Sequence, residues 1–171
     1  MFVSNTSTLI LLAKISALRI FLDNAPTIII PEEVKEEYQQ KTLLDTKLIE
    51  YEISQQRIIV KKDENKTKDI VHQFNLDRGE AAAYCLFDKK KHLAILTDDG
   101  ELIKLCKLTN TPFICALAII ARLYEKDALT KQETLEKMEK LTIVGRYSPA
   151  IYDHYRKEVE KHGNSLRKNE Y

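Results

Sequence analysis

Short apolar runs alternate with amphipathic segments over the first two thirds of the chain. The runs with strand character are residues 1–4, 27–30, 57–60, 92–97 and 112–115. Between them, apolar residues recur at helical spacing, which predicts helices over residues 9–15, 17–22, 43–55, 66–75, 100–108 and 116–123, and a further helix beginning at Pro31. Strands that alternate with helices in this way predict an α/β fold, a three-layer sandwich whose central parallel sheet is flanked by helices.

The pattern changes after Glu125, where charged helices replace the alternation. Thr130 and Glu133 match a capping box that would open a helix through Lys140, and Ser148 with Pro149 would open another that ends near residue 162. We therefore expect one domain over residues 1–125 and a helical C-terminal extension over residues 126–171 that packs on it.

Composition narrows the function classes only slightly. Lys plus Arg (27) and Asp plus Glu (26) nearly cancel, so no overall field favours nucleic acid or a membrane surface. No apolar run approaches the length that spans a membrane. The three cysteines lack metal-ligand spacing and lie in apolar contexts, which favours reduced core thiols. We expect a cytoplasmic protein.

The informative acids lie in one unit, residues 76–100. Asp77 and Glu80 open its helix, and Asp98 and Asp99 directly follow its strand. Asp77 with Glu80, and Asp98 with Glu101, also match an ordinary helix-opening capping pattern, so neither pattern indicates a site by itself. The two patterns together do indicate a site, because parallel strands end at one edge of the sheet, where ligands bind. Carboxylates there suit Mg²⁺, and paired ions can activate water and stabilise the leaving oxygen of a phosphodiester.

Four segments resemble the motifs of the PIN-domain (PilT N-terminal) ribonucleases, close to the VapC-like toxins. They are VSNTSTLILLAKI at residues 3–15, IPEEVKEE at 30–37, LDRGEA at 76–81 and LTDD at 96–99. The resemblance covers residues 1–123 and implies a PIN-like nuclease domain over residues 1–125. It implies an endoribonuclease that hydrolyses single-stranded RNA with Mg²⁺ or Mn²⁺, often as a homodimer and often covered by a small antitoxin protein.

The resemblance also assigns residues to roles. It implies catalytic roles for Asn5, Glu37, Glu80, Asp98 and Asp99, metal binding by Asn5, Glu80, Asp98 and Asp99, and support from the hydroxyls of Thr6, Ser7 and Thr97. We expect the five catalytic side chains to line one cleft at the carboxyl edge of the sheet. Without a cation, mutual repulsion should raise the pKa of at least one of these carboxyl groups.

One position departs from the family pattern: Asn5 stands where the first motif carries an aspartate. The amide offers a neutral oxygen, so the site lacks one negative charge. Two functions remain open, a ribonuclease weakened by Asn5 and a PIN module that binds RNA or a protein partner without cleaving. A third alternative, a receiver-like or haloacid-dehalogenase-like phosphotransfer domain, ranks last because Asn5 cannot be its nucleophile and Glu37 and Glu80 have no place in it.

Overall fold

A five-stranded parallel sheet forms the centre of the protein. The computed structural model describes residues 1–40, 44–62 and 73–168, apart from the side chains of residues 37–40 and 163–168. The strands are β1 (Phe2–Ser4), β2 (Ile28–Pro31), β3 (Ile58–Lys61), β4 (Ile95–Leu96) and β5 (Phe113–Ile114), in the order β3-β2-β1-β4-β5. All four strand pairs are parallel, so the carboxyl ends of the strands lie along one edge of the sheet.

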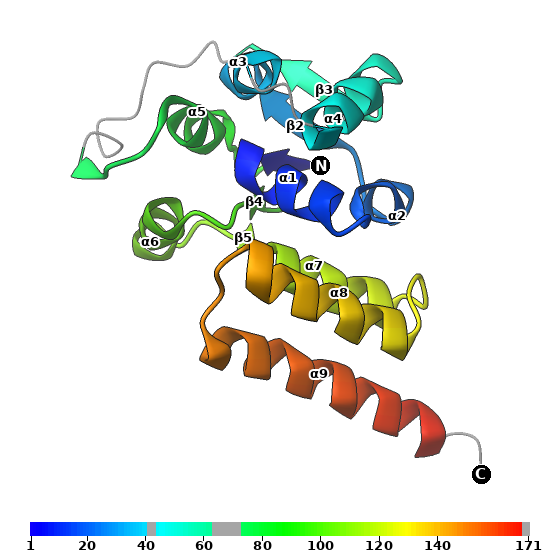
Figure 1. The fold of residues 1–171 in the computed structure, drawn as a ribbon. Coiled ribbons are helices and arrows are strands. Elements are labelled where there is room, and N and C mark those ends of the chain that lie inside the picture. Colours follow the sequence, from blue (N-terminus) through cyan, green and yellow to red (C-terminus); the bar gives the residue numbers. More distant parts are fainter. Residues whose placement is uncertain (41–43, 63–72, 169–171) are drawn as a thin grey trace.

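Helices join the strands and cover both faces of the sheet (Figure 1). They are α1 (Thr6–Lys14), α2 (Leu18–Asn24), α3 (Glu32–Gln40), α4 (Leu44–Ser54), α5 (Arg78–Leu86), α6 (Gly100–Leu108), α7 (Ala116–Glu125), α8 (Lys131–Val144) and α9 (Pro149–Lys168). The predicted α/β sandwich is confirmed. The predicted helix over residues 66–75 falls mainly on residues 63–72, outside the described residues.

Two apolar clusters hold the layers together because successive strand side chains point to opposite faces. Ile28, Ile30 and Leu96 pack with α1, α2, α4 and α7, whereas Val3 and Ile95 pack with α5 and α6. Each of these five strand residues is fully buried. The aliphatic face of α1 therefore lies inside the protein, and the start of α1 is fixed at the carboxyl edge of the sheet.

Helices α8 and α9 pack on α7 and extend the first cluster outward. Met138 and Leu141 of α8 and Val159 of α9 are buried within it. The Lys137 ammonium donates to the Ile15 carbonyl at 3.0 Å, which ties α8 to the end of α1. Figure 1 shows α9 as the outermost helix of this stack.

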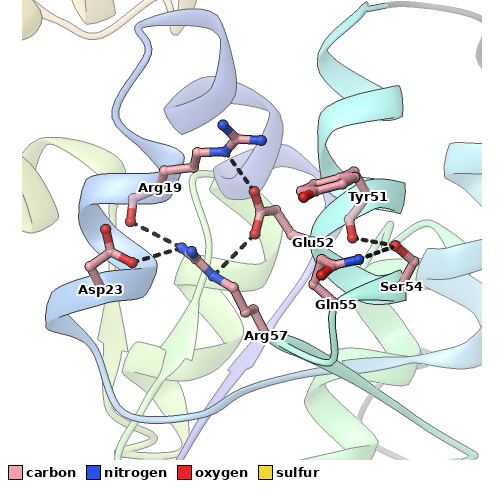
Figure 2. A network of polar contacts seen from close by, with 7 residues as sticks. All are labelled: Arg19, Asp23, Tyr51, Glu52, Ser54, Gln55 and Arg57. Carbon is pink, nitrogen blue, oxygen red and sulfur yellow. Dashed lines mark hydrogen bonds and ion pairs between the residues drawn. The ribbon is translucent and has the colours of Figure 1, made fainter.

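A buried carboxylate links three elements at the amino edge of the sheet (Figure 2). Glu52 of α4 is 1% exposed and receives a 2.8 Å hydrogen bond from Arg19 of α2. Arg57, just before β3, pairs with Glu52 at 3.1 Å and with Asp23 at 3.0 Å. Both arginines are partly exposed, so the charge is compensated without burying the cations.

Several predicted boundaries were wrong. Helix α8 ends at Val144 and not at Lys140, and α1 begins at Thr6 and not at residue 9. The strand expected over residues 92–97 is only β4, because the Asp88 N–H donates to His92 Nδ1 and the His92 N–H donates to the Asp88 carbonyl. These bonds form a turn where the apolar run suggested strand. Helix α9 continues to Lys168 instead of ending near residue 162, since a glycine inside a helix costs only about 1 kcal/mol and no proline follows it.

Candidate functional site

A cavity of about 540 Å³ lies at the carboxyl edge of the sheet. Its walls come from the residues after β1 and β4, from the start of α5 and from the connection between α8 and α9. The lining residues are Asn5, Thr6, Ser7, Ile10, Leu11, Asp77, Glu80, Asp98, Asp99, Val144, Gly145 and Arg146. The structure thus brings four of the five predicted catalytic residues to one cavity. The fifth, Glu37, lies on α3, and its side chain is outside the described part of the chain.

Glu80 and Asp99 face each other from the starts of two helices. Asp77 and Glu80 form a reciprocal capping box on α5, with 2.7 Å and 2.9 Å hydrogen bonds. Asp99 caps α6 by accepting the Leu102 N–H at 2.7 Å. Burial, followed by the negative charges of Asp77 and Asp99, raises the pKa of Glu80 to about 7. Burial is the largest cause of this raised pKa, and the expected repulsion between neighbouring carboxylates adds to it.

The Asp98 carboxylate is turned toward donors of the protein itself. It accepts the Thr8 hydroxyl at 2.7 Å, the Ala116 N–H at 3.1 Å to each oxygen, and the Tyr147 hydroxyl. Burial raises the pKa of Asp98 although these donors act to lower it. Burial and the neighbouring Asp98 charge also raise the pKa of Tyr147. Asp98 therefore joins α1, α7 and the α8–α9 connection at one point.

Asn5 is 1% exposed, and both ends of its amide are engaged. Its Nδ2 donates to Thr97 Oγ1 at 3.1 Å, and its Oδ1 accepts the Ser7 hydroxyl at 3.0 Å. The Asn5 side chain makes no capping bond to α1, although Asn5 is the N-cap residue. Thr97 Oγ1 also accepts the Asp99 N–H at 3.1 Å, so one hydroxyl connects Asn5 to the acidic pair. The predicted supporting hydroxyls of Ser7 and Thr97 thus contact this network, and Thr6 lines the cavity.

The first turns of α3 lie beside the α5 wall of the site. Glu36, which shares α3 with Glu37, forms a 3.0 Å ion pair with Arg78, the first residue of α5. Glu33, one turn before Glu37, has a buried Oε2 that lacks a hydrogen-bond partner among the described residues. The second predicted motif is therefore next to the cavity, while the position of the Glu37 carboxylate is not described.

The donor set suits a hydrated divalent cation better than a fully protein-ligated one. In residues 1–40, 44–62 and 73–168, no three His, Cys, Asp or Glu side chains are grouped closely enough to hold a metal. Glu80 and Asp99 nevertheless form a close acidic pair, whose repulsion a cation would relieve. Mg²⁺ is commonly held by one or two carboxylates while it keeps several waters. The residues present fit such an ion.

Part of this site has no recognisable signal in the sequence. Tyr147 lies 49 residues from Asp98, and Arg146 comes from a region without a recognisable motif. Thr8 belongs to the first motif, but its contact with Asp98 depends on how α1 packs against the end of β4. Asp77 was recognisable as a helix cap, and its place in the cavity wall follows from that role.

A parallel α/β sandwich with an acidic cavity at the carboxyl edge of its sheet defines the class of this protein. A family model described as a PIN domain matches residues 1–161, and the chain belongs to the PIN-domain family. PIN domains are generally nucleases that hydrolyse RNA with divalent metal ions. This membership gives the phosphotransfer alternative no support. No match was found among curated proteins or solved structures. Among the described helices, none has the length and apolar character to cross a membrane.

Proposed function

We propose that the protein is a metal-dependent endoribonuclease that cleaves single-stranded RNA in the acidic cavity, at a rate limited by Asn5. The observation that carries the proposal is the opposed pair Glu80 and Asp99, one of which has a pKa raised to about 7 by burial and by its acidic neighbours. The single-stranded substrate, a small antitoxin partner and a homodimer follow from the resemblance to the VapC-like toxins and belong to the proposal on that ground.

Glu80 and Asp99 would hold the Mg²⁺ or Mn²⁺, and the Asn5 carbonyl would add a neutral oxygen. When bound, such an ion acts as a Lewis acid and lowers the pKa of a coordinated water. Ser7 can keep its hydrogen bond to Asn5, because a carbonyl oxygen accepts two bonds. We leave Asp98 out of this ligand set, since donors of the protein already occupy its oxygens. Its role in the proposal is to fix the walls of the cavity.

The starts of the helices around the cavity favour an anionic substrate. The N-cap residues of α1, α5 and α6, which are Asn5, Asp77 and Asp99, all line it. The positive end of a helix dipole stabilises a nearby phosphate, and the N–H groups of the first turn can donate to it. In α1 the Asn5 side chain makes no capping hydrogen bond to the first turn, unlike the caps of α5 and α6.

The second candidate function, an RNA- or protein-binding PIN module that does not cleave, is favoured by one observation. The Asn5 amide is buried and bonded to two hydroxyls, and it can neither add negative charge nor accept a proton. If that charge is essential, the cavity would bind a ligand without hydrolysing it.

RNA cleavage with Mn²⁺ distinguishes the two functions. We expect the natural chain to cut labelled mixed-sequence single-stranded RNA slowly, and EDTA to abolish the cleavage. Glu80→Gln and Asp99→Asn should each reduce the rate about 100-fold. Both replacements keep an acceptor for the helix cap, so folding should survive. Glu139→Gln, an exposed acid on α8, is the matched control and should cleave like the natural chain.

Two results would contradict the proposed function. RNA that is bound but remains intact with Mn²⁺ would move the assignment to the non-cleaving module. A cleavage rate that neither Glu80→Gln nor Asp99→Asn lowers would show that the activity does not come from this cavity.

A further inference from the structure

The connection between α8 and α9 forms one wall of the acidic cavity. Val144, Gly145 and Arg146 line the cavity, and the next residue, Tyr147, donates its hydroxyl to Asp98. On the other side, the Gly145 N–H donates to the Leu141 carbonyl at 2.8 Å and closes α8. Arg146 is therefore fixed between two anchored neighbours, at the edge of the site.

Gly145 allows this close turn. A Cβ at this position would lie 2.5 Å from Tyr147 Cε2 and 2.9 Å from the Leu141 carbonyl oxygen. Without a side chain at Gly145, the Tyr147 ring can fold back over the end of the helix and reach Asp98. Arg146 itself has φ 53°, the left-handed conformation that often follows a helix and favours Gly or Asn. The backbone therefore gives no local reason for an arginine at this position.

Acidic side chains outnumber basic side chains in the cavity. Four carboxyl groups line it, and Arg146 is the one basic residue among the described lining residues. Asp98 is occupied by protein donors, and Asp77, Glu80 and Asp99 cap helices. Arg146 is exposed, and it makes no hydrogen bond or ion pair with any described side chain. A guanidinium held at an acidic cavity without an internal partner is available to an anionic ligand.

We propose that Arg146 binds the phosphodiester backbone of the RNA in this cavity. A planar guanidinium presents paired N–H donors that match two phosphate oxygens. The inference rests on the proposed function and adds to it a substrate-binding residue contributed by the C-terminal helices. The alternative role, an internal counterion for the carboxylates, has no ion pair among the described side chains to support it.

Binding of RNA, measured separately from cleavage, tests this role. Fluorescence anisotropy with labelled single-stranded RNA in Ca²⁺ buffer, over a series of salt concentrations, should show about tenfold weaker binding for Arg146→Ala. The slope of log affinity against log salt should become shallower by about 0.7, the value for one lost contact to single-stranded nucleic acid. Arg146→Lys should restore the slope, and a gel should show the recovered RNA intact.

Arg156→Ala is the matched control, because Arg156 lies on α9 and pairs with Glu160 outside the cavity. It should bind RNA like the natural chain. If the natural chain binds RNA and Arg146→Ala shows the same affinity and salt slope, this inference is overturned while the proposed function stands. An Arg146→Ala variant with unchanged RNA binding but tighter Mn²⁺ binding would make Arg146 a counterion. A natural chain that neither binds nor cleaves RNA would overturn both proposals.

Discussion

Two adjacent aspartates at the end of β4 show how differently neighbouring residues can be used. The Asp98 oxygens accept four hydrogen bonds from α1, α7 and Tyr147. Asp99 caps α6 and lies next to Glu80. A sequence pattern predicts that both acids reach the carboxyl edge, since both follow the strand. It cannot distinguish them, because the partners of Asp98 come from three distant segments.

The four contacts of Asp98 predict that this residue contributes to the stability of the fold. Asp98→Ala should lower the free energy of unfolding by about 1–3 kcal/mol, because it leaves the Thr8 and Tyr147 hydroxyls and the Ala116 N–H without their acceptor. The measurement is thermal unfolding without metal ions. Asp153→Ala, an exposed aspartate on α9, is the control and should stay within about 0.5 kcal/mol of the natural chain. Equal melting temperatures for the two variants would contradict the anchoring role of Asp98.

Among the helices and strands, the starts of helices were predicted correctly where a capping box marks them in the sequence. The capping boxes of Asp77 with Glu80 and of Thr130 with Glu133 are both present, and they set the starts of α5 and α8. The limits of β4 were missed because the ring of His92 accepts a backbone N–H and closes a turn. That contact depends on the path of the whole loop, which the apolar pattern does not encode.

The ion pairs of Glu52 with Arg19 and Arg57 predict a loss of stability when Glu52 is replaced. Glu52→Gln should lower the free energy of unfolding by about 1–3 kcal/mol, because a buried amide would replace the carboxylate that pairs with Arg19 and Arg57 (Figure 2). RNA cleavage per folded molecule should not change, since the network lies at the amino edge of the sheet. Chemical denaturation and the cleavage assay measure the two effects.

Glu125→Gln is the matched control for this prediction. Glu125 pairs with the exposed Arg122 at 2.7 Å near the end of α7, and a surface pair of this kind contributes at most about 1 kcal/mol. If Glu52→Gln were no more destabilising than Glu125→Gln, the network would not hold α2, α4 and β3 together.

For the protein as a whole, the packing of the C-terminal helices is the feature that the sequence predicted least. The family match runs to residue 161, and α8 and α9 share a continuous apolar core with α1 and α7. The Lys137 contact to Ile15 spans 122 residues. We propose that residues 126–168 fold together with the first 125 residues as one unit. Alternating strands and helices predicted the sheet, but contacts over such separations have no local sequence signal.

The proposed activity depends on the negative charge of the cavity, and position 5 is where that charge can be changed with the least effect on shape. Thr97 now accepts from the Asn5 amide, and its hydroxyl could instead donate to a carboxylate at this position. Asn5→Asp should therefore fit, add one negative charge beside Glu80 and Asp99, and strengthen metal binding.

The most direct measurement is single-turnover cleavage of single-stranded RNA by the natural chain and by Asn5→Asp, each with and without Asp99→Asn. We expect weak cleavage by the natural chain, stronger with Mn²⁺ than with Mg²⁺. Asn5→Asp should cleave about tenfold faster, which corresponds to about 1.4 kcal/mol of transition-state stabilisation. Asp99→Asn should reduce the rate about 100-fold in both backgrounds. Equal rates for the two position-5 chains, or a rate that Asp99→Asn leaves unchanged, would contradict the proposed function.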